Sequence, residues 1–567
     1  MSSEPQEVIP FSRSDVFIRC STSKGQACQA CQCMGLSEID EQILRLPDRI
    51  SDLKARRREL KNKINHQHDP LFRNLPPEIV SQVFAEYVEQ ANFEFESQFD
   101  ISSKRGWAPP FLLSSVCQLW RLRAIQTPEI WTTINIHLKS RNVPLRVTLA
   151  QQLVDYSHQL PLSINIFSNE YVQGHSDLLD ILIRCAARWK HLALSVPSRW
   201  YQYFSNHVGA APPQLQSLRL HPCKSEPRID HVFDMPHTPS LTFLDISQIR
   251  FKDIRIQFQN LTHLTLYQIP IHSFLKILEC SPLLTTCIAR RICDSDGWDD
   301  TPLCSPVHLS LTDLHFHPDC SAVLYSFFKQ ATLPFLQKFT YDGTFYPDSD
   351  PDLAACRLFF TRSQCKLTHF TLTNAKLSGI ATLLQLLLDQ PTITHLSLQF
   401  PLDYKCPSIT TFFYYLAGSD DAPQTAFLPA LQELCLQSQW NFSWNLLPDI
   451  FPANPSRSPS SSRVVSGHPS QVNITRPLRT VKLCLFVPFI DTFITRSALR
   501  RIVLICRRGF NLRIVNQHGI DLIEEGLEKY ASEVSGWGLD VDVDVDDEDE
   551  THQRYVSWDL CSGSHRE

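Results

Sequence analysis

Cysteine is the residue whose type and spacing in this sequence could hold a metal ion. Cys28 and Cys31 have the spacing of half a zinc site, in which each thiolate supplies one of four ligands. No second pair follows at a matching spacing, and the nearest histidines are His66 and His68. Residues 1–36 are therefore predicted to be a disordered tail with free thiols and no bound metal. The alternative, an enzyme or metal protein, would be built around Cys20, Cys28, Cys31 and Cys33.

The motifs that carry common catalytic chemistry are absent from the sequence. It contains no Gly-x-x-x-x-Gly-Lys-Ser/Thr phosphate loop and no Gly-x-Gly-x-x-Gly nucleotide fingerprint. It also lacks the Gly-x-Ser-x-Gly nucleophile turn and the His-Glu-x-x-His zinc helix. The sequence therefore predicts a chain that is not an enzyme and has no cofactor.

A small helical module is predicted over residues 71–137. A helix should begin at its Pro-Pro dipeptide, because a missing N–H donor costs least in the first turn of a helix. Ile79, Val83 and Phe84 recur at helical spacing and are predicted to share one apolar face. A second helix is expected from about 112 to 125.

The order of short motifs in this module resembles the F-box family. A Leu-Pro-x-Glu-Ile opening lies at 75–79, a Val-Cys-x-x-Trp-Arg segment at 116–121 and a closing Ile-Trp at 130–131, with an insert at 89–110. The resemblance implies docking onto the Skp-type adaptor of an SCF ubiquitin ligase, whose scaffold is a cullin. The alternative is an ordinary helical pair around a buried tryptophan. The residues implied in adaptor binding are Leu75, Pro76, Ile79, Val83, Leu112, Val116 and Trp120.

A helix with a coiled-coil pattern is predicted ahead of this module, over residues 37–66. Pro47 interrupts the pattern, so we expect a kink or a late start near Asp48. The second half is basic, but it has no interleaved aromatic residues, which favours a solvated helix face over a nucleic-acid site. The helix could pair two copies of the chain or fold back on the helical module. Its apolar positions alternate at spacings of four and three, with Arg57 in one of them: Ile39, Ile43, Leu46, Ile50, Leu53, Leu60 and Ile64.

A repeat of the form Leu-x-x-Leu-x-Leu dominates the segment 138–530. Each unit cannot bury its apolar face alone, whereas stacked neighbours can. The pattern resembles F-box proteins with irregular leucine-rich repeats, which implies an α/β fold in which the helical module precedes a curved solenoid. Copies begin at Trp189, Leu215, Leu241, Leu261, Leu284, Leu311, Leu336, Leu367, Ile393, Leu431 and Leu478.

The repeat also predicts which residues meet a partner. Side chains alternate along a strand, so the second and third leucines should point into the core and the residues between them toward the concave face. We expect a target protein to contact the middle of this face, near Tyr267, His315 and Lys338. Histidines on the face could indicate a metal ladder or a pH switch, but most lie on strands separated by one without a histidine.

Composition narrows the class of protein. The net charge of -6 gives no overall attraction to nucleic acid. No apolar run is long enough for a membrane span, and the N-terminus has no signal-peptide core. The 19 cysteines are then expected to be reduced, in a cytoplasmic or nuclear protein. A Pro/Ser-rich loop at 451–477 and an acidic tail at 531–567 are predicted to be disordered.

These features together predict the substrate-recognition subunit of an SCF-type ubiquitin ligase. The helical module would hold the adaptor and cullin, and the repeats would hold a target that the sequence does not identify. The alternative is a non-catalytic interaction scaffold that acts outside a ligase. Recovery of cullin together with the adaptor would distinguish the two.

Overall fold

The computed structural model divides the chain into two compact units. Unit 1 comprises Met1–Ile136, Asn142–Asn165 and Ser176–Arg188; unit 2 comprises His137–Arg141, Ile166–His175 and Trp189–Glu567. The tail at 1–32, the loop at 452–475 and the acidic tail at 531–567 lie outside the described residues. The structure describes residues 33–68, 70–97, 109–139, 143–168, 175–197, 199–208, 212–222, 233–249, 251–294, 307–344, 352–377, 379–401, 409–418, 427–439, 443–451, 476–486 and 494–530.

Helices make up most of unit 1. Its first helix is longer than predicted, since it begins at Cys33, a residue assigned to the disordered tail, and passes through Pro47 without a late start. A proline removes one backbone hydrogen bond, and the turns on either side keep theirs. The elements are α1 (Cys33–His68), α2 (Pro70–Asn74), α3 (Pro77–Ser97), α4 (Pro109–Val116), α5 (Gln118–Ile125), η1 (Pro128–Trp131), α6 (Val143–Tyr156), α7 (His175–Arg184) and η3 (Ala186–Arg188).

Two boundaries in the helical module differ from the sequence prediction. The helix predicted over about 112–125 is two helices, because Cys117 has an extended backbone with φ -155° and ψ 176°. Its Sγ accepts a hydrogen bond from the Trp120 N–H at 3.5 Å, so the cysteine caps the second helix. The insert predicted at 89–110 is partly helical, since α3 continues to Ser97 and α4 begins at Pro109.

A long, mostly parallel sheet of 14 strands runs through the chain. Its order is β1-β2-β3-β4-β6-β8-β9-β10-β11-β12-β13-β14-β15-β16. The predicted boundary after residue 137 falls inside β1, because the strand continues to Leu138. Its strands are β1 (Thr133–Leu138), β2 (Leu162–Ser168), β3 (Trp189–Val196), β4 (Ser217–Pro222), β6 (Phe243–Ser247), β8 (His263–Tyr267), β9 (Thr286–Ile292), β10 (Asp313–Pro318), β11 (Lys338–Asp342), β12 (His369–Thr373), β13 (His395–Gln399), β14 (Glu433–Gln439), β15 (Thr480–Phe486) and β16 (Asn511–Asn516).

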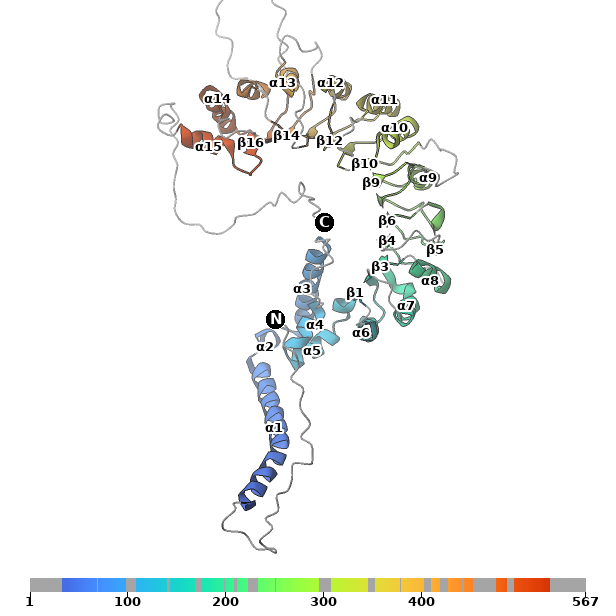
Figure 1. The fold of residues 1–567 in the computed structure, drawn as a ribbon, viewed down its shortest axis with the longest axis vertical. Coiled ribbons are helices and arrows are strands. Elements are labelled where there is room, and N and C mark those ends of the chain that lie inside the picture. Colours follow the sequence, from blue (N-terminus) through green and yellow to red (C-terminus); the bar gives the residue numbers. More distant parts are fainter. Residues whose placement is uncertain are drawn as a thin grey trace, which may run out of the picture. The chain divides into compact units, whose positions relative to one another are not determined.

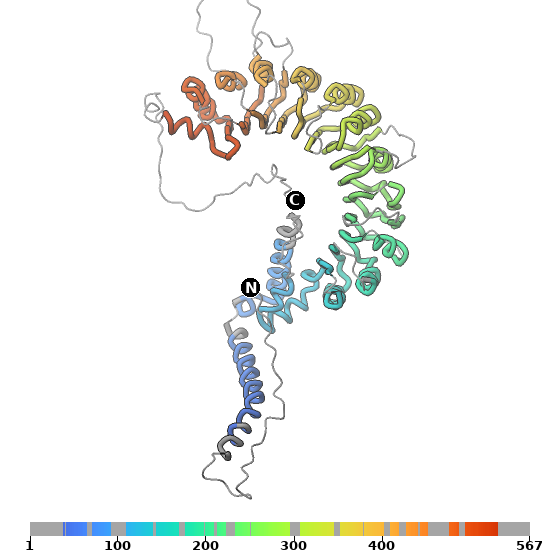
Figure 2. Tube along the Cα trace, viewed as in Figure 1, coloured from blue at the N-terminus to red at the C-terminus, as the bar shows by residue number. Residues whose placement is uncertain are grey.

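The helices of unit 2 lie on one side of its strands (Figure 1). The chain trace shows the reason, since each strand leads through a helical or irregular segment into the next parallel strand (Figure 2). A separate pair, β5 (Phe233–Met235) and β7 (Ile254–Ile256), is also parallel. The helices are α8 (Arg199–His207), η4 (Phe251–Asp253), α9 (Ile271–Cys280), α10 (Ser321–Gln330), α11 (Leu353–Ser363), α12 (Ile380–Leu388), α13 (Ile409–Ala417), η5 (Trp444–Ile450), α14 (Arg496–Arg507) and α15 (Leu522–Lys529).

The predicted alternation of side chains along the repeat strands is confirmed except in β6, where Asp245 and Ser247 are buried together with Leu244 and Ile246. In β10, Leu314 and Phe316 are fully buried, whereas Asp313, His315 and His317 are only partly buried. The sheet therefore presents one buried face to the helices and one polar face to its surroundings.

The ends of the loop predicted at 451–477 belong to the core, because Phe451 and Arg476 are both buried.

Candidate protein-binding surfaces

Large apolar side chains are exposed on helices α3 and α4 of unit 1, and we call this set the apolar patch. Four of the seven residues assigned to adaptor binding are large apolar side chains with exposures of 39–56%. Pro76 is also exposed, while Leu75 and Trp120 are partly buried. The sequence missed Tyr87 and Leu122, which are 45% and 50% exposed on α3 and α5. The four exposed members of the predicted set are Ile79, Val83, Leu112 and Val116.

The predicted apolar face of α3 is corrected by the structure. Phe84 is buried together with Val80 and Val88, which follow the spacing of one helix face. Ile79 and Val83 lie away from this buried side and remain exposed. The helix therefore has one apolar side inside unit 1 and a second apolar side outside it.

Two tryptophans fix the helices beneath the patch. Trp120 packs with ring centroids 5.0 Å from Phe84 and 6.4 Å from Phe72, so it joins α5 to α3 and α2. Trp131 is fully buried, and its indole N–H donates to the carbonyl of Ala124 at 2.6 Å. Trp120 is thus mainly a packing residue with a partly exposed edge.

The three residues assigned to target binding lie on the polar side of the sheet, which we call the strand face. This face consists of the partly exposed side chains of β8–β15 that alternate with the buried ones. Lys338 is paired in register with Asp313, and His315 is two residues further along β10, at the next position on the same face. Tyr267 lies on β8 and is paired with Arg290 of β9, so a whole strand separates it from β10. The structure therefore brings His315 and Lys338 together but not Tyr267.

One row across the strand face carries charges of both signs and ends in an ion pair. Lys338 follows Asp313 in the row, and Glu433 stands further along. The carboxylate of Glu433 accepts from the Lys482 ammonium at 2.9 Å. Because these side chains are partly solvated, their ion pair contributes little stability and leaves charge accessible to a partner. The residues of the row, in strand order, are Asp313, Lys338, His369, His395 and Glu433.

The two histidines of this row stack on each other, which the sequence rule about separated histidines missed. Their ring centroids are 4.1 Å apart and their planes differ by 5°. Each Nδ1 lies 2.9 Å from the hydroxyl of the preceding threonine, Thr368 for His369 and Thr394 for His395. Both hydroxyls donate to backbone carbonyls, so we assign Nδ1–H donors to the two rings. Thr-His dipeptides on consecutive repeats are the sequence signal for this arrangement.

Burial favours the neutral form of three histidines of the strand face, His315, His317 and His369. It lowers the pKa of His369, with the neighbouring His395 acting in the same direction. Burial also lowers the pKa of His315, opposed by Asp313. The pKa of His317 falls to about 4 through burial, although Asp342 lies 3.5 Å away and opposes the shift. The face therefore offers hydrogen-bond donors and acceptors rather than an additional cluster of positive charge.

The described cysteines have the environment of structural thiols. Burial raises the pKa of Cys365 to about 12 and raises the pKa of Cys356 strongly. Within the ranges that the structure describes, no group of three or more His, Cys, Asp or Glu residues is placed to hold a metal ion. Cys20, Cys28 and Cys31 lie outside those ranges, so the prediction of free thiols there stays a prediction.

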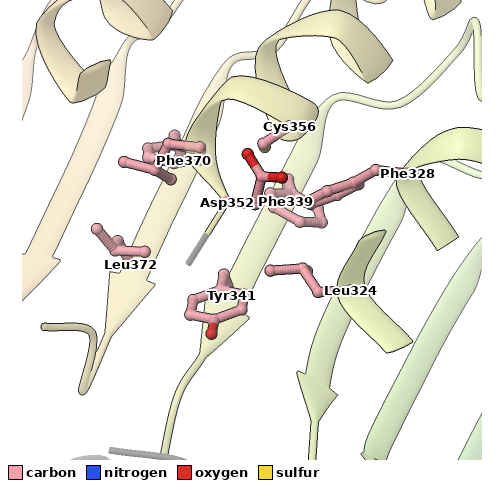
Figure 3. Close-up of a pocket in the computed structure, with 9 residues that line it drawn as sticks. Leu324, Phe328, Phe339, Tyr341, Asp352, Cys356, Phe370 and Leu372 are labelled. Atoms are coloured by element: carbon pink, nitrogen blue, oxygen red, sulfur yellow. The ribbon is translucent and has the colours of Figure 1, made fainter. Parts of the chain in front are cut away.

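A narrow crevice lies between β11, β12 and the helices that cover them (Figure 3). Its lining is mostly aromatic and aliphatic, and its cavity volume is about 10 Å³, roughly what one water molecule needs. Ligand pockets usually enclose about 300–1,000 Å³. The carboxylate of Asp352 at its edge is used to cap α11, since it accepts from the Ala355 N–H at 2.8 Å. The crevice is therefore packing space between elements rather than a ligand site.

A scan against protein-family models finds no match for this chain, and a search of curated proteins finds no similar sequence. Of the helices that the structure describes, none combines the length and apolar character needed to cross a membrane.

Proposed function

We propose that this chain is the substrate-recognition subunit of an SCF-type ubiquitin ligase. Unit 1 would contain an F-box that docks the Skp-type adaptor, and unit 2 would be a leucine-rich-repeat solenoid that binds a target protein. The observation that carries the proposal is the exposed apolar patch at the F-box positions. Large apolar side chains gain about 25 cal/mol per Å² when they leave water, so such a patch favours a protein partner.

The strand face supports the second half of the proposal. Its side chains are polar with a few aromatics, and polar groups with aromatic anchors are typical of a surface that binds proteins. A receptor of this kind needs no catalytic residues, because the ubiquitin transfer belongs to other subunits. The polar face, the apolar patch and the lack of catalytic motifs in the sequence are therefore consistent with one function.

A charge placed in the apolar patch tests adaptor docking. Val116 is 56% exposed, so Val116→Glu should leave the fold of unit 1 intact while placing a carboxylate against the adaptor. We expect recovery of a Skp-type adaptor with the full chain to fall by at least about tenfold. Leu145→Glu is the matched control, because Leu145 is an apolar residue of unit 1 that is 70% exposed on α6, outside the patch. Equal adaptor recovery by both variants would contradict the proposal.

The same purification separates a ligase subunit from an interaction scaffold. If the chain is a receptor, cullin should be recovered with the adaptor by the parent and by the Leu145→Glu control. Recovery of the adaptor without cullin would instead favour a scaffold acting outside a ligase. The target can then be sought by comparing proteins recovered with the ubiquitin ligase active and stalled.

A further inference from the structure

The apolar seam of α1 faces outward along its whole length. Its members have exposures of 47–60%, although each is a large aliphatic side chain. From the first to the last, the seam covers 26 residues, or about 38 Å of helix. Lone exposed leucines are ordinary, but a continuous stripe is typical of an interface. The seam residues are Ile39, Ile43, Leu46, Ile50, Leu53, Leu60 and Ile64.

The helix also needs stabilisation from outside itself. A proline inside a helix removes a backbone hydrogen bond and clashes with the preceding turn, and α1 contains Pro47. Helices in water depend mainly on packing of their apolar side rather than on local propensity. Ion pairs within the helix, such as the one between Glu59 and Lys63 at 2.8 Å, are fully exposed and contribute little. A partner along the seam would supply the missing burial.

We propose that this partner is α1 of a second copy of the chain, in an antiparallel two-stranded coiled coil. The pattern places isoleucine at most a positions and leucine at most d positions, which gives the continuous aliphatic seam that a coiled coil requires. Arg57 is the exception at an a position, and a polar residue there restricts register and orientation. The inference goes beyond adaptor and target binding and does not depend on either.

Charge excludes the parallel arrangement. In a parallel pair, each g position faces the following e position of the other helix. Arg49 would then face Lys54 and Arg56 would face Lys61, on both sides of the pair, and Arg57 would face its own copy. Like charges placed opposite each other are unfavourable, and five such pairs would line one short interface.

The antiparallel arrangement removes most of this repulsion. With the helices fully overlapped, Ile50 faces Leu53 of the second copy, and Arg57 faces Leu46 instead of another arginine. The aliphatic stem of the arginine can then cover the leucine while its guanidinium reaches water. The other seam positions pair apolar with apolar in the same register.

The two halves of α1 also carry opposite charge. Residues 37–50 hold four carboxylates and two cations, a net charge of -2. Residues 51–64 hold two carboxylates and six cations, a net charge of +4. An antiparallel pair places the acidic half of each helix beside the basic half of the other, whereas a parallel pair places like beside like. Charge complementarity therefore selects a second copy as the occupant and fixes its direction.

The mass of the full chain in solution, measured by sedimentation over a range of concentrations, tests pairing. We expect the parent to dimerise and Leu53→Asp to weaken the dimer by at least about tenfold, since it charges the central layer. Leu44→Asp is the matched control, because Leu44 is 77% exposed at a b position, off the seam. The Leu44→Asp variant should dimerise over the same concentration range as the parent. A parent that stays monomeric throughout, or a Leu53→Asp variant that dimerises like Leu44→Asp, would overturn the proposal.

A charge reversal tests direction. Lys61→Glu places a carboxylate against the acidic segment 38–41 of an antiparallel partner, so the dimer should weaken. In a parallel dimer the same carboxylate would meet Arg56 and the dimer would tighten. Tightening or no change would overturn the antiparallel arrangement. Melting of unit 2 in each variant shows that the remaining fold is unaffected.

Discussion

Arg476 is a buried arginine whose guanidinium binds backbone carbonyls. Its Nη1, Nη2 and Nε donate to Leu416, Phe427 and Leu428 at 2.6, 2.8 and 3.2 Å. Burial lowers its pKa to about 10, which still leaves it charged at neutral pH. The side chain thereby ties the segment before β15 to the end of α13. The sequence placed this residue in a disordered loop, because the Pro/Ser composition of 451–477 concealed one structural arginine near its end.

Replacing Arg476 with methionine should destabilise unit 2. Methionine fills similar space but donates no hydrogen bond. The carbonyls of Leu416 and Phe427 lose the arginine donor at about 1–3 kcal/mol each, partly recovered by relaxation, whereas that of Leu428 still accepts from the Leu431 N–H at 3.2 Å. We expect the free energy of unfolding to fall by about 2–4 kcal/mol in chemical denaturation of unit 2. Arg479→Met is the control, because Arg479 is an exposed arginine three residues away. If the free energy of unfolding falls no more for Arg476→Met than for Arg479→Met, the contacts with the carbonyls do not contribute to stability.

His308 is a second residue whose role depends on burial. It is 3% exposed, its Nε2 lies 2.6 Å from the Ser281 carbonyl, and its Nδ1 accepts from the Leu311 N–H at 3.2 Å. One ring nitrogen donates and the other accepts, so the neutral ring fits both contacts. Burial lowers the pKa of His308 below its usual 6.5. Protonation would break the contact with Leu311.

Acidification should therefore destabilise the native chain through His308. The unfolded state binds a proton at pH values where the folded residue does not, so stability is full above pH 6.5 and falls as the pH drops below it. His308→Leu cannot take up that proton. We expect the melting temperature to fall less between pH 7 and pH 5 for His308→Leu than for the parent. If the melting temperatures of the parent and His308→Leu fall equally, His308 does not contribute to the pH dependence, and any such dependence comes from other groups.

The strands could be predicted from the sequence because the same hydrophobic pattern marks each of them. Leu-x-x-Leu-x-Leu places leucines on one side of each strand, and the structure has a strand at each predicted copy. The helices between them were harder to predict, since their apolar spacing lasts only two or three turns. Helix α11 illustrates this, because Arg362 lies within it and donates to two carbonyls at the end of α10, including that of Ala331 at 2.6 Å. Only the packed neighbour explains that arginine.

Which side of a helix or strand is exposed was harder to predict than where that helix or strand lies in the sequence. Ile79 and Val80 are adjacent and similar in chemistry, yet Ile79 is 42% exposed and Val80 is fully buried. The helical period relates positions to one another, but which side faces the core is decided by the helices packed around it. For the same reason, the sequence assigned Tyr267 to a group with His315 and Lys338, although the strand register separates them.

At the scale of the whole molecule, the proposed function assigns the two tasks to different units. Under this proposal, adaptor binding would depend on helices of unit 1, and target binding would depend on the strand face of unit 2. Side chains on that face do not support the core, since the buried leucines of the same strands do so. Changes on the face should therefore alter partner choice without altering folding or adaptor docking. A dimer through α1 would double both surfaces, so a bivalent target would bind more tightly by avidity.

Removing Tyr267, His315 and Lys338 together tests where the target binds. The triple alanine variant should recover less target protein while recovering the adaptor as the parent does, because hot spots concentrate at the centre of an interface. A matched control replaces the same residue types on the helix side of unit 2. If both variants recover the same targets, and exchange of the loop 451–477 or the acidic tail removes them, recognition lies in those segments instead. The control residues are His272, Tyr325 and Lys329, on α9 and α10.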